Sequence, residues 1–289
     1  MVERVGEGNL KDFLSYCQKY GGEHDDSYLP GDDFTIDDDH PSFLLYDEDR
    51  RVSGASSLML EEHYRRASKG RFMIFHSTQS GLAGYSSLLE AVLAEATGVV
   101  RSVYLFVPPG PEIQRMLEEL GFEIERYSFV MKRNMTDFEI PIQEGVSFVT
   151  FNEREDRELY CHIVNSAFKK IAGHIDIKPD RVSTMIEKYN IPAEGIQLLY
   201  FEGTPVGLFF SEITEDGMLE IGPIAVLPEY QGRGLGRALL RRAVQLSQRL
   251  GLDSVLSVNA ENEKALSLYL KEGFTRLGTR ICYGMDLNP

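Results

Sequence analysis

The sequence predicts an α/β fold in which helices cover both faces of a mixed sheet, and it predicts that this fold occurs twice. The chain has 289 residues, enough for two domains of roughly 140 residues each. Its C-terminal half has the pattern of antiparallel hairpins followed by strand–helix–strand–helix units. The chain also resembles itself when shifted, so that Gln79 falls on Gln231 and Gly84 falls on Gly236. A repeat of this kind indicates tandem copies of one structural plan.

The elements of the C-terminal half follow from its hydrophobic periodicity. We predict strands over 146–151, 196–202, 205–213, 218–227 and 253–258, and a final strand pair over 274–286. Helices are predicted near 153–169 and 179–189, and over 234–250 and 261–272. The helix over 234–250 has the clearest pattern, because its apolar residues recur every three or four positions and Gly251 follows as the stop. Residues 203–205 and 215–217 are the predicted hairpin turns.

A glycine-rich turn, residues 230–236, joins the strand over 218–227 to the helix over 234–250. The first N–H groups of a helix have no intrahelical partner, so such a turn suits a phosphate or a pyrophosphate. Its glycines let the backbone approach the anion closely. The motif G-x-x-x-x-G-K-[ST] does not occur, and G-x-G-x-x-G fails because Leu239 replaces its third glycine. The alternative interpretation is a structural turn with glycines placed for tight packing.

The pattern that remains, Q-x-x-G-x-G over Gln231, Gly234 and Gly236, resembles the GNAT superfamily of N-acetyltransferases. The stretch 224–231 extends the resemblance, which covers about 147–286. In that family the turn holds the pyrophosphate of acetyl-coenzyme A (acetyl-CoA). The resemblance therefore implies two tandem GNAT-like acyl-CoA N-acyltransferase domains, with acetyl-CoA as the co-substrate.

The same resemblance assigns residues that would bind acetyl-CoA. The strand backbone would contact the pantetheine arm, the N–H of Val226 would donate to the oxyanion, and the turn would cradle the pyrophosphate. An asparagine on a later helix would bind the pantetheine. The residues are Ile224, Ala225, Val226, Gln231, Gly232, Arg233, Gly234, Leu235, Gly236, Arg237 and Asn262. Burial in a strand explains the apolar side chains without any function, and solvation at a helix start explains the arginines.

Two residues are candidates for proton transfer. Tyr269 lies seven residues after Asn262, so both are on one helix face, and the resemblance makes Tyr269 the proton donor to the departing thiolate. The alternative without a function is that Tyr269 is a residue of the core and Asn262 is an ordinary residue of the first helical turn. Glu220 precedes Val226 by six residues, the spacing that the histone-acetylating branch uses for its base.

The role of Glu220 as the base depends on the geometry of its strand. Alternation places Glu220 and Val226 on one face of the sheet if no bulge intervenes, but a bulge near Ala225 is common in the family. Two alternatives are open. Glu220 is an exposed carboxylate on the strand without a catalytic role, or a chain of water molecules removes the proton from the amine. In the bacterial ribosomal-protein branch of the family, the base lies five residues before the asparagine. That position is Ser257 in this chain, and a serine is unsuitable as a base.

The first copy departs from the second at the positions that carry this chemistry. The residues that correspond at an offset of 152 are Leu82 for Gly234, Ser80 for Gly232, Gly110 for Asn262, Leu117 for Tyr269 and Ser68 for Glu220. We therefore predict a degenerate GNAT-like domain over 1–140 and an active N-acetyltransferase domain over 145–289. The alternative is that both copies bind coenzyme A but differ in the residues that contact it.

The composition favours a cytoplasmic protein that binds neither nucleic acid nor membrane. The formal net charge of −15 disfavours a nucleic-acid backbone as ligand. No apolar run has the length of a membrane span, and the N-terminus lacks the apolar core of a signal peptide. Three dispersed cysteines fit reduced thiols, and six histidines without ligand spacing give no support for a metal. The acidic stretch 23–39 either attracts a cationic substrate or is a solvated loop.

The predicted function is an acetyl-CoA-dependent N-acetyltransferase that acetylates a primary amine of an unidentified small molecule or peptide. By resemblance, 167–178 and 278–284 would contact this acceptor. One alternative is a mycothiol synthase-like acetyltransferase, because that family also has tandem GNAT domains with one active copy. Another is a non-catalytic acyl-CoA sensor or interaction module. We expect either a monomer whose tandem copies form a pseudo-dimer or a homodimer.

Overall fold

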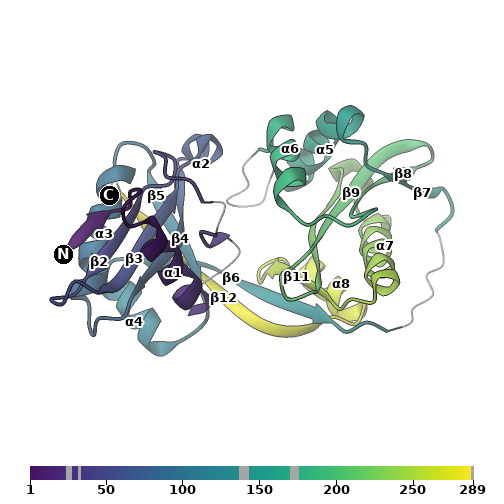
Figure 1. Ribbon diagram of the computed structural model, residues 1–289. Coiled ribbons are helices and arrows are strands. Elements are labelled where there is room, and N and C mark those ends of the chain that lie inside the picture. Colours follow the sequence, from purple (N-terminus) through teal and green to yellow (C-terminus); the bar gives the residue numbers. More distant parts are fainter. Residues whose placement is uncertain (24–27, 32–33, 137–142, 170–175, 288–289) are drawn as a thin grey trace. The chain divides into compact units, whose positions relative to one another are not determined.

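The computed structural model describes residues 1–23, 28–31, 34–136, 143–169 and 176–287 (Figure 1). The chain forms two compact units: unit 1 comprises Met1–Ser128 and Thr279–Pro289, and unit 2 comprises Phe129–Gly278. Both boundaries fall inside strands, β6 (Glu123–Arg133) and β12 (Thr275–Asp286). They differ from the expected division into 1–140 and 145–289, because a boundary inside a strand carries no turn or linker signal.

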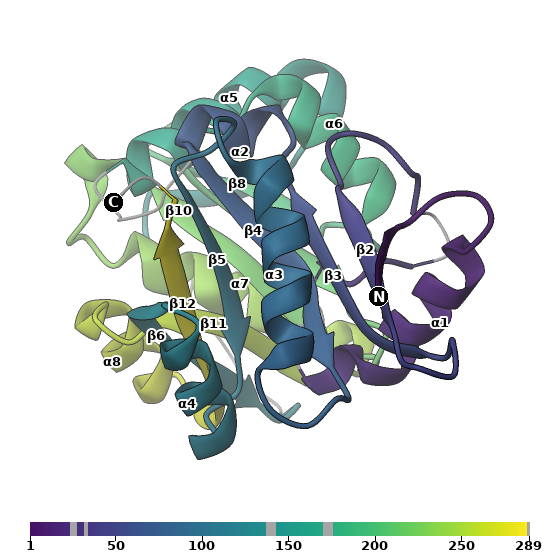
Figure 2. The same ribbon diagram turned by 90° about the vertical axis from the view of Figure 1, so that its left-hand side faces the viewer.

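Unit 1 is a mixed sheet with helices on both faces. Its strands lie in the order β1-β2-β3-β4-β5-β12, antiparallel except for the parallel pair β4–β5. Helix α3 packs on one face through Leu88 and Val92 (Figure 2), and α1 packs on the other through Phe13. The elements are β1 (Val2–Arg4), α1 (Leu10–Tyr20), η1 (Gly21–Glu23), β2 (Ser42–Tyr46), β3 (Val52–Met59), α2 (Glu62–Ala67), β4 (Lys69–Ser77), α3 (Ala83–Ala96), β5 (Ser102–Val107) and α4 (Pro111–Glu119).

Unit 2 repeats this plan, with strands in the order β6-β11-β10-β9-β8-β7. Helix α7 packs on one face through Leu239 and Ala243, and α5 and α6 pack on the other through Tyr160 and Val182. The elements are β7 (Val146–Thr150), α5 (Glu153–Phe168), α6 (Pro179–Lys188), β8 (Ile196–Phe201), β9 (Thr204–Ile213), β10 (Leu219–Val226), η3 (Pro228–Tyr230), α7 (Leu235–Leu250), β11 (Ser254–Asn259) and α8 (Glu263–Lys271). The predicted mixed-sheet fold with helices on both faces is confirmed.

The two units share one order of elements over their second halves. Each element of unit 2 there begins 152 residues after its counterpart. The pairs of first residues are Ala83 and Leu235 (α3, α7), Ser102 and Ser254 (β5, β11), Pro111 and Glu263 (α4, α8), and Glu123 and Thr275 (β6, β12). The offset seen in the sequence is therefore also the offset of the folded elements.

The strand pair expected over 274–286 is wrong, because this segment is the single strand β12. Gly278 lies within it and is absent from the glycines of positive φ, so the chain makes no tight turn there. Its later residues pair with β5, from Ile281 opposite Val107 to Asp286 opposite Ser102. A strand pattern alone does not reveal where its partner lies, and this strand has its partner in unit 1.

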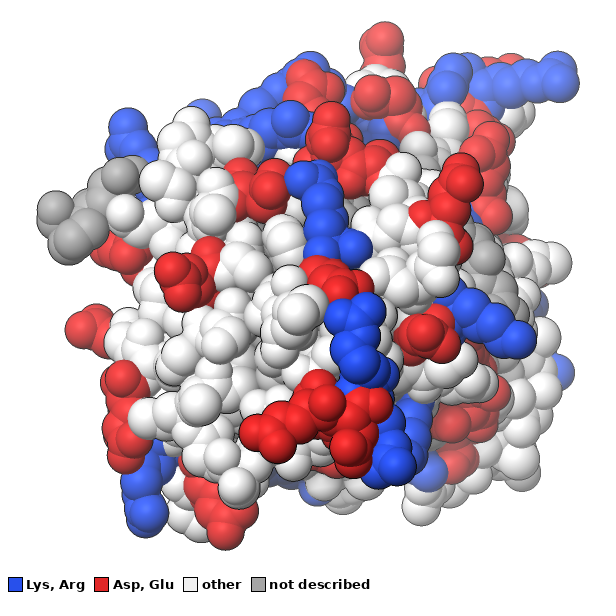
Figure 3. All heavy atoms as spheres, turned by 60° about the vertical axis from the view of Figure 1, so that its left-hand side comes forward, with Lys and Arg blue, Asp and Glu red and all other residues white. Residues whose placement is uncertain are grey.

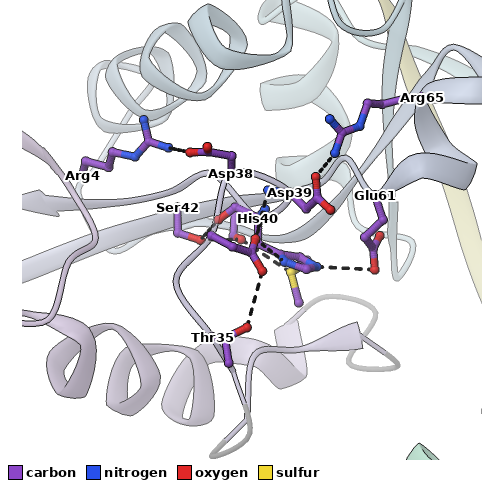
Figure 4. A network of polar contacts seen from close by, with 11 residues as sticks. Arg4, Thr35, Asp38, Asp39, His40, Ser42, Glu61 and Arg65 are labelled. Atoms are coloured by element: carbon purple, nitrogen blue, oxygen red, sulfur yellow. Dashed lines mark hydrogen bonds and ion pairs between the residues drawn. The ribbon is translucent and has the colours of Figure 1, made fainter. Parts of the chain in front are cut away.

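Part of the acidic stretch is held by polar contacts rather than left as a solvated loop (Figure 4). The Nδ1 of His40 lies 2.8 Å from a carboxylate oxygen of Asp37, and its Nε2 lies 3.4 Å from Glu61. The hydrogen bond with Glu61 raises the pKa of His40, although burial opposes it. Two further ion pairs join the stretch to neighbouring elements, Arg4 with Asp38 and Arg65 with Asp39.

Acidic and basic side chains are interspersed on the face of the molecule shown in Figure 3, which is not dominated by one sign of charge. Within the described part of the chain, no helix is long and apolar enough to cross a membrane.

Candidate functional site

The site begins where the parallel strands β10 and β11 separate. Their register joins Leu219 to Ser254 and Glu220 to Val255, at the start of both strands. β10 then continues along β9 as far as Val226, opposite Gly207. The later residues of β10 therefore have one backbone edge that faces away from β9. The pairing with β11 does not extend to this edge. In a strand, such an edge presents N–H groups to a ligand.

A β-bulge lies in β10 before this edge. The register with β9 shifts between Ile221 and Ile224, so one extra residue is inserted at 222–223. As a result Ile221 and Val226 both point into the core under α7, whereas Ala225 points into the core under α5. Neighbouring residues of a strand point to opposite faces, so Glu220 lies on the face opposite to that of Ile221. This is the face of Ala225. The arrangement expected without a bulge, with Glu220 and Val226 on one face, does not occur.

The N–H of Val226 lies on the edge of β10 that faces away from β9. Leu227 donates its N–H to the carbonyl oxygen of Val206 on β9 at 2.8 Å. Alternate residues of a strand present their N–H groups to opposite edges, so Val226 and Ile224 present theirs away from β9. The carbonyl oxygen of Val226 accepts a hydrogen bond from Nε2 of Gln231 at 2.9 Å, which joins the glycine-rich turn to the strand end.

The glycine-rich turn has the conformation that its sequence indicates. Gly232 and Gly234 have φ of 79° and 83°, a region that side-chain-bearing residues rarely adopt. Gly234 is the N-cap of α7 and makes no side-chain capping bond. The N–H groups of Leu235 and the next two residues therefore have no intrahelical acceptor. Gly236 lies inside the helix with open space where a Cβ would stand, so neither φ nor packing requires glycine there.

Three arginines of the turn and the first part of α7, namely Arg233, Arg237 and Arg241, have partners within the chain. Arg237 lies 3.0 Å from a carboxylate oxygen of Glu272, and Arg241 lies 2.7 Å from the other oxygen. The Glu272 side chain is only 5% exposed, so this triad is a fixed part of the structure. Arg233 lies with its guanidinium 5.3 Å from the ring centre of Tyr230, and it donates to a backbone oxygen at 3.4 Å. Arg233 is thus the more adaptable cation at the turn.

Asn262 and Tyr269 belong to α8. Asn262 caps this helix, because its Oδ1 accepts a hydrogen bond from the N–H of Ala265 at 3.2 Å. Its side-chain amide nitrogen is not part of that cap. Tyr269 packs against the core that contains Val226 and Leu235, with its ring 6.0 Å from that of Phe274. Burial raises the pKa of Tyr269 to about 12, so its hydroxyl stays protonated at neutral pH.

The sequence analysis missed Glu212. It lies directly opposite Glu220 in the antiparallel pair β9–β10, and both side chains are partly buried. Burial, and then the charge of Glu220, raise the pKa of Glu212 to about 7. A signal was available in the sequence, because the two glutamates stand at equal distances from the hairpin turn that contains Asp216. Counting outward from the turn would have paired them.

The predicted residues thus fall into two groups. Ile224, Val226, the turn over 231–237 and Tyr269 surround the edge of β10 and the start of α7. Glu220 lies on the opposite side of β10, the side of Ala225. Of the expected acceptor segment 167–178, residues 170–175 lie outside the described residues. The other segment, 278–284, lies in β12.

Unit 1 has a different geometry at the matching positions. Leu82 is the N-cap of α3 and has φ −83°, whereas the N-cap of α7 is left-handed; in unit 1 the left-handed residue is Gly81, one position earlier, at φ 80°. Leu117 is fully buried in the core under α3. The rings of Phe72, Phe75 and Phe122 fill this core, with centroids 5.0 to 6.1 Å apart. Among the residues that the structure describes, no group of three His, Cys, Asp or Glu side chains is placed to hold a metal ion.

Comparison with known proteins shows what this chain is similar to. Residues 165–274 match the acetyltransferase (GNAT) family, and they contain the bulged strand, the turn and α8. Over these residues the chain is similar to the GNAT acetyltransferases. The chain is similar in fold to the crystal structure of a GCN5-related N-acetyltransferase from Sphaerobacter thermophilus, with a TM-score of 0.74 and 16% sequence identity. The match covers 100% of this chain and 96% of that one.

A second solved structure and two curated relatives are also similar to this chain. A tandem GNAT protein from the clavulanic acid biosynthesis pathway has a TM-score of 0.73 and 12% identity, and covers 100% of this chain and 99% of its own. Mycothiol acetyltransferase of Pseudarthrobacter chlorophenolicus is 28% identical over 57% of this chain and 54% of its own length. That of Streptomyces coelicolor is 26% identical over 73% of this chain and 69% of its own. The chain thus spans about half the length of the first of these relatives.

Proposed function

We propose that residues 145–289 form an acetyl-CoA-dependent N-acetyltransferase that acetylates a primary amine of a small molecule or peptide. The observation that carries the proposal is the uncapped start of α7, with left-handed Gly232 and Gly234, beside the edge of β10 that faces away from β9. An uncapped helix start favours a phosphate group, and the edge supplies hydrogen-bond donors a short distance away.

The residues of this region fit acetyl-CoA. The N–H groups of 232–237 would hold the diphosphate, with Arg233 adding charge from the turn. Backbone groups of Ile224 and Val226 would contact the pantetheine arm. The side-chain amide nitrogen of Asn262, whose Oδ1 accepts from the N–H of Ala265, would do the same. Bound acetyl-CoA would supply an acetyl group activated as a thioester. The N–H of Val226 would stabilise negative charge on the acetyl oxygen.

The chain's own residues would move two protons. An amine with a pKa near 10 is protonated at neutral pH and must lose a proton before it can attack, a step for which Glu220 is the proposed base. Tyr269 would serve the departing sulfur. A thiol has an ordinary pKa of about 8.5, well below that of Tyr269, so the tyrosine would act chiefly by donating a hydrogen bond.

Unit 1 is proposed to be degenerate. The right-handed cap at Leu82 and the buried aromatic core support this proposal, since both differ from the features of unit 2 that suit a diphosphate. Calorimetric titration of the full chain with acetyl-CoA tests it, and we expect one molecule bound per chain. A stoichiometry near two would contradict the assignment.

The matched variants for the site are at the two ends of α7. Gly234 and Gly251 both have left-handed φ, and no atom stands within 3.4 Å of an added Cβ at either. We expect Gly234→Leu to abolish detectable acetyl-CoA binding, whereas Gly251→Leu should lower stability and leave the affinity unchanged. Equal affinities for the two variants would remove the turn from the site.

The second candidate function is that of a mycothiol acetyltransferase, favoured by relatives of that name. A thioester-release screen over polyamines, aminoglycosides, peptides and the amine precursor of mycothiol would distinguish the acceptors. Turnover of the precursor alone would favour the second candidate. Tight binding of acetyl-CoA without turnover of any amine would favour an acyl-CoA sensor.

A further inference from the structure

The connection between β6 and β7, residues 134–145, touches the glycine-rich turn at its far end. The Nε2 of Gln143 donates a hydrogen bond to the carbonyl oxygen of Arg233 at 3.2 Å. Its Oε1 lies 3.4 Å from the point where a Cβ on Gly234 would stand, so the carboxamide packs against that glycine. All three residues belong to unit 2. Gln143 is not among the residues that the family resemblance assigns to acetyl-CoA.

The topology of the sheet brings the start of β7 close to the turn. Val146 of β7 pairs with Phe201 at the end of β8. β9 returns from there and pairs with β10, so that Gly207 lies opposite Val226. The start of β7 and the end of β10 are therefore at the same end of the sheet, the end at which α7 begins. Val146 also packs in one core with Leu235, the first residue of α7.

The backbone around Gln143 is held by a tight turn of its own. The N–H of Val146 donates to the carbonyl oxygen of Gln143 at 3.1 Å, which closes a four-residue turn. Gly145, the third residue of this turn, has a φ of 78°, as a type II turn requires at that position. The carbonyl oxygen of Gly145 accepts a hydrogen bond from the N–H of Glu202 at 2.8 Å. Gln143 thus reaches the glycine-rich turn from a fixed point of the sheet.

The hydrogen bond from Gln143 fixes the orientation of one peptide group in the glycine-rich turn. The carbonyl of Arg233 and the N–H of Gly234 belong to the same peptide group, and the described residues contain no cis peptide bond. In a planar trans peptide the C=O and N–H bonds point in opposite directions. The N–H of Gly234 therefore points away from Gln143, and it cannot turn around unless the hydrogen bond breaks.

A restraint of this kind is most useful at a glycine. Gly232 and Gly234 have left-handed φ, and glycine loses more conformational freedom on ordering than any other residue. A site that is ordered before the ligand arrives binds it more tightly, because less entropy is lost on binding. Gln231 restrains the turn from the side of β10, and Gln143 restrains it from the side of β7.

We propose that Gln143 is a positioning residue of the acetyl-CoA site, which aims the N–H of Gly234 at the diphosphate by holding the carbonyl oxygen of Arg233. The proposal rests on the proposed function, because it concerns the same turn. Gln143 would touch neither the acetyl group nor the acceptor. Its loss should therefore weaken acetyl-CoA and CoA equally, since both ligands carry the diphosphate, and should leave kcat unchanged.

The other end of the β6–β7 connection provides a matched control. Gln248, near the end of α7, donates a hydrogen bond from its Nε2 to the carbonyl oxygen of Thr136. Both contacts join a glutamine carboxamide to a backbone carbonyl, but only the contact of Gln143 is at the start of α7. A methionine removes the hydrogen-bond donors at either position and keeps a side chain of similar length.

The first experiment compares Gln143→Met with Gln248→Met by calorimetric titration with CoA and with acetyl-CoA. We expect both affinities to fall by about two- to fivefold in Gln143→Met, the effect of one partly solvated hydrogen bond. Gln248→Met should lower the stability of the protein and leave both affinities unchanged. Equal affinities of the wild type and Gln143→Met would overturn the proposal. Equal losses in the two variants would also overturn it, because they would indicate a general structural effect.

The second experiment observes the N–H of Gly234 directly by NMR. In protein with isotopically labelled glycine, the signal of Gly234 is the one that disappears in Gly234→Ala. We expect CoA to move its amide proton downfield in the wild type, because a charged phosphate oxygen is a strong acceptor. The movement at saturation should be smaller in Gln143→Met and unchanged in Gln248→Met. An equal movement in the wild type and Gln143→Met would contradict the positioning role, even if the affinity falls.

The outcomes separate the two levels of inference. A wild type that binds neither CoA nor acetyl-CoA, or whose Gly234 signal responds to neither, would contradict the proposed function and this proposal with it. Binding by the wild type with undiminished affinity in Gln143→Met would contradict this proposal alone. A lower affinity together with a smaller response of Gly234 would support both.

Discussion

The side chain of Gln231 donates a hydrogen bond to the carbonyl oxygen of Val226 over 2.9 Å, and so joins the glycine-rich turn to the last residue of β10. The proposed anion-binding start of α7 and the proposed oxyanion donor thereby keep a fixed spacing. In Gln231→Leu this bond is lost and the carbonyl oxygen loses its partner. We expect acetyl-CoA affinity to fall by about fivefold, because the hydrogen bond that holds the turn contributes roughly 1 kcal/mol. Calorimetry is the measurement, and unchanged affinity would show that the turn is held by other contacts.

Tyr269→Phe tests the role of the phenol at the departing sulfur. Removing the hydroxyl keeps the packing against Phe274, so acetyl-CoA affinity should stay within twofold. Turnover should fall by roughly ten- to a thousandfold if the hydroxyl serves the leaving group. Tyr127→Phe, at an exposed tyrosine of unit 1, is the control. Steady-state kinetics with any accepted amine gives the answer, and unchanged kcat would exclude Tyr269 from the reaction.

The triad of Glu272 with Arg237 and Arg241 predicts a large loss of stability on substitution. Glu272→Gln leaves both arginines without their carboxylate in a site where that side chain is only 5% exposed. We expect the free energy of unfolding to fall by about 2–3 kcal/mol. Arg249→Gln removes an exposed partner of Glu194 and should cost less than about 1 kcal/mol. Urea unfolding of both variants provides the comparison.

His40 predicts a pH dependence of stability in unit 1. Its pKa is raised above the ordinary value by Glu61 and Asp37. The protonated form is therefore stabilised by folding. This contribution is complete below pH 6.5 and disappears as the pH rises through the folded pKa. The difference in urea midpoint between wild type and His40→Asn should thus be larger at pH 6 than at pH 9. An equal difference at both values would contradict the ion pairs.

Tyr160→Phe separates stability from acceptor binding. Among the residues that the structure describes, the hydroxyl of the fully buried Tyr160 has no hydrogen-bond partner, so its removal should stabilise the free protein by about 1 kcal/mol. Thermal unfolding measures this gain. The same variant should raise KM for an amine acceptor if the hydroxyl contacts it. A loss of stability instead would mean that the hydroxyl is satisfied in solution.

The parts of the site that depend on local sequence could be predicted. The turn and the start of α7 follow from Gly232 and Gly234, because both have the left-handed backbone that favours glycine. Asn262 and Tyr269 could be placed together because their spacing fixes a helix face. These predictions needed no knowledge of distant partners.

The parts that depend on pairing between strands could not be predicted in the same way. The bulge at 222–223 reverses the face of Glu220, and no residue pattern in β10 signals it by itself. Glu212 becomes relevant only when the register of the hairpin is known. The salt bridge between Arg237 and Glu272 joins residues from two helix ends, and such contacts arise from tertiary packing.

The single strand β12 has a practical consequence for anyone who clones the halves separately. A fragment cut between 140 and 145 would leave the N-terminal piece without the residues that pair with β5. A bare strand edge invites association with other chains. Expression of that piece alone should give aggregates, whereas appending 279–289 through a flexible linker should restore a soluble product.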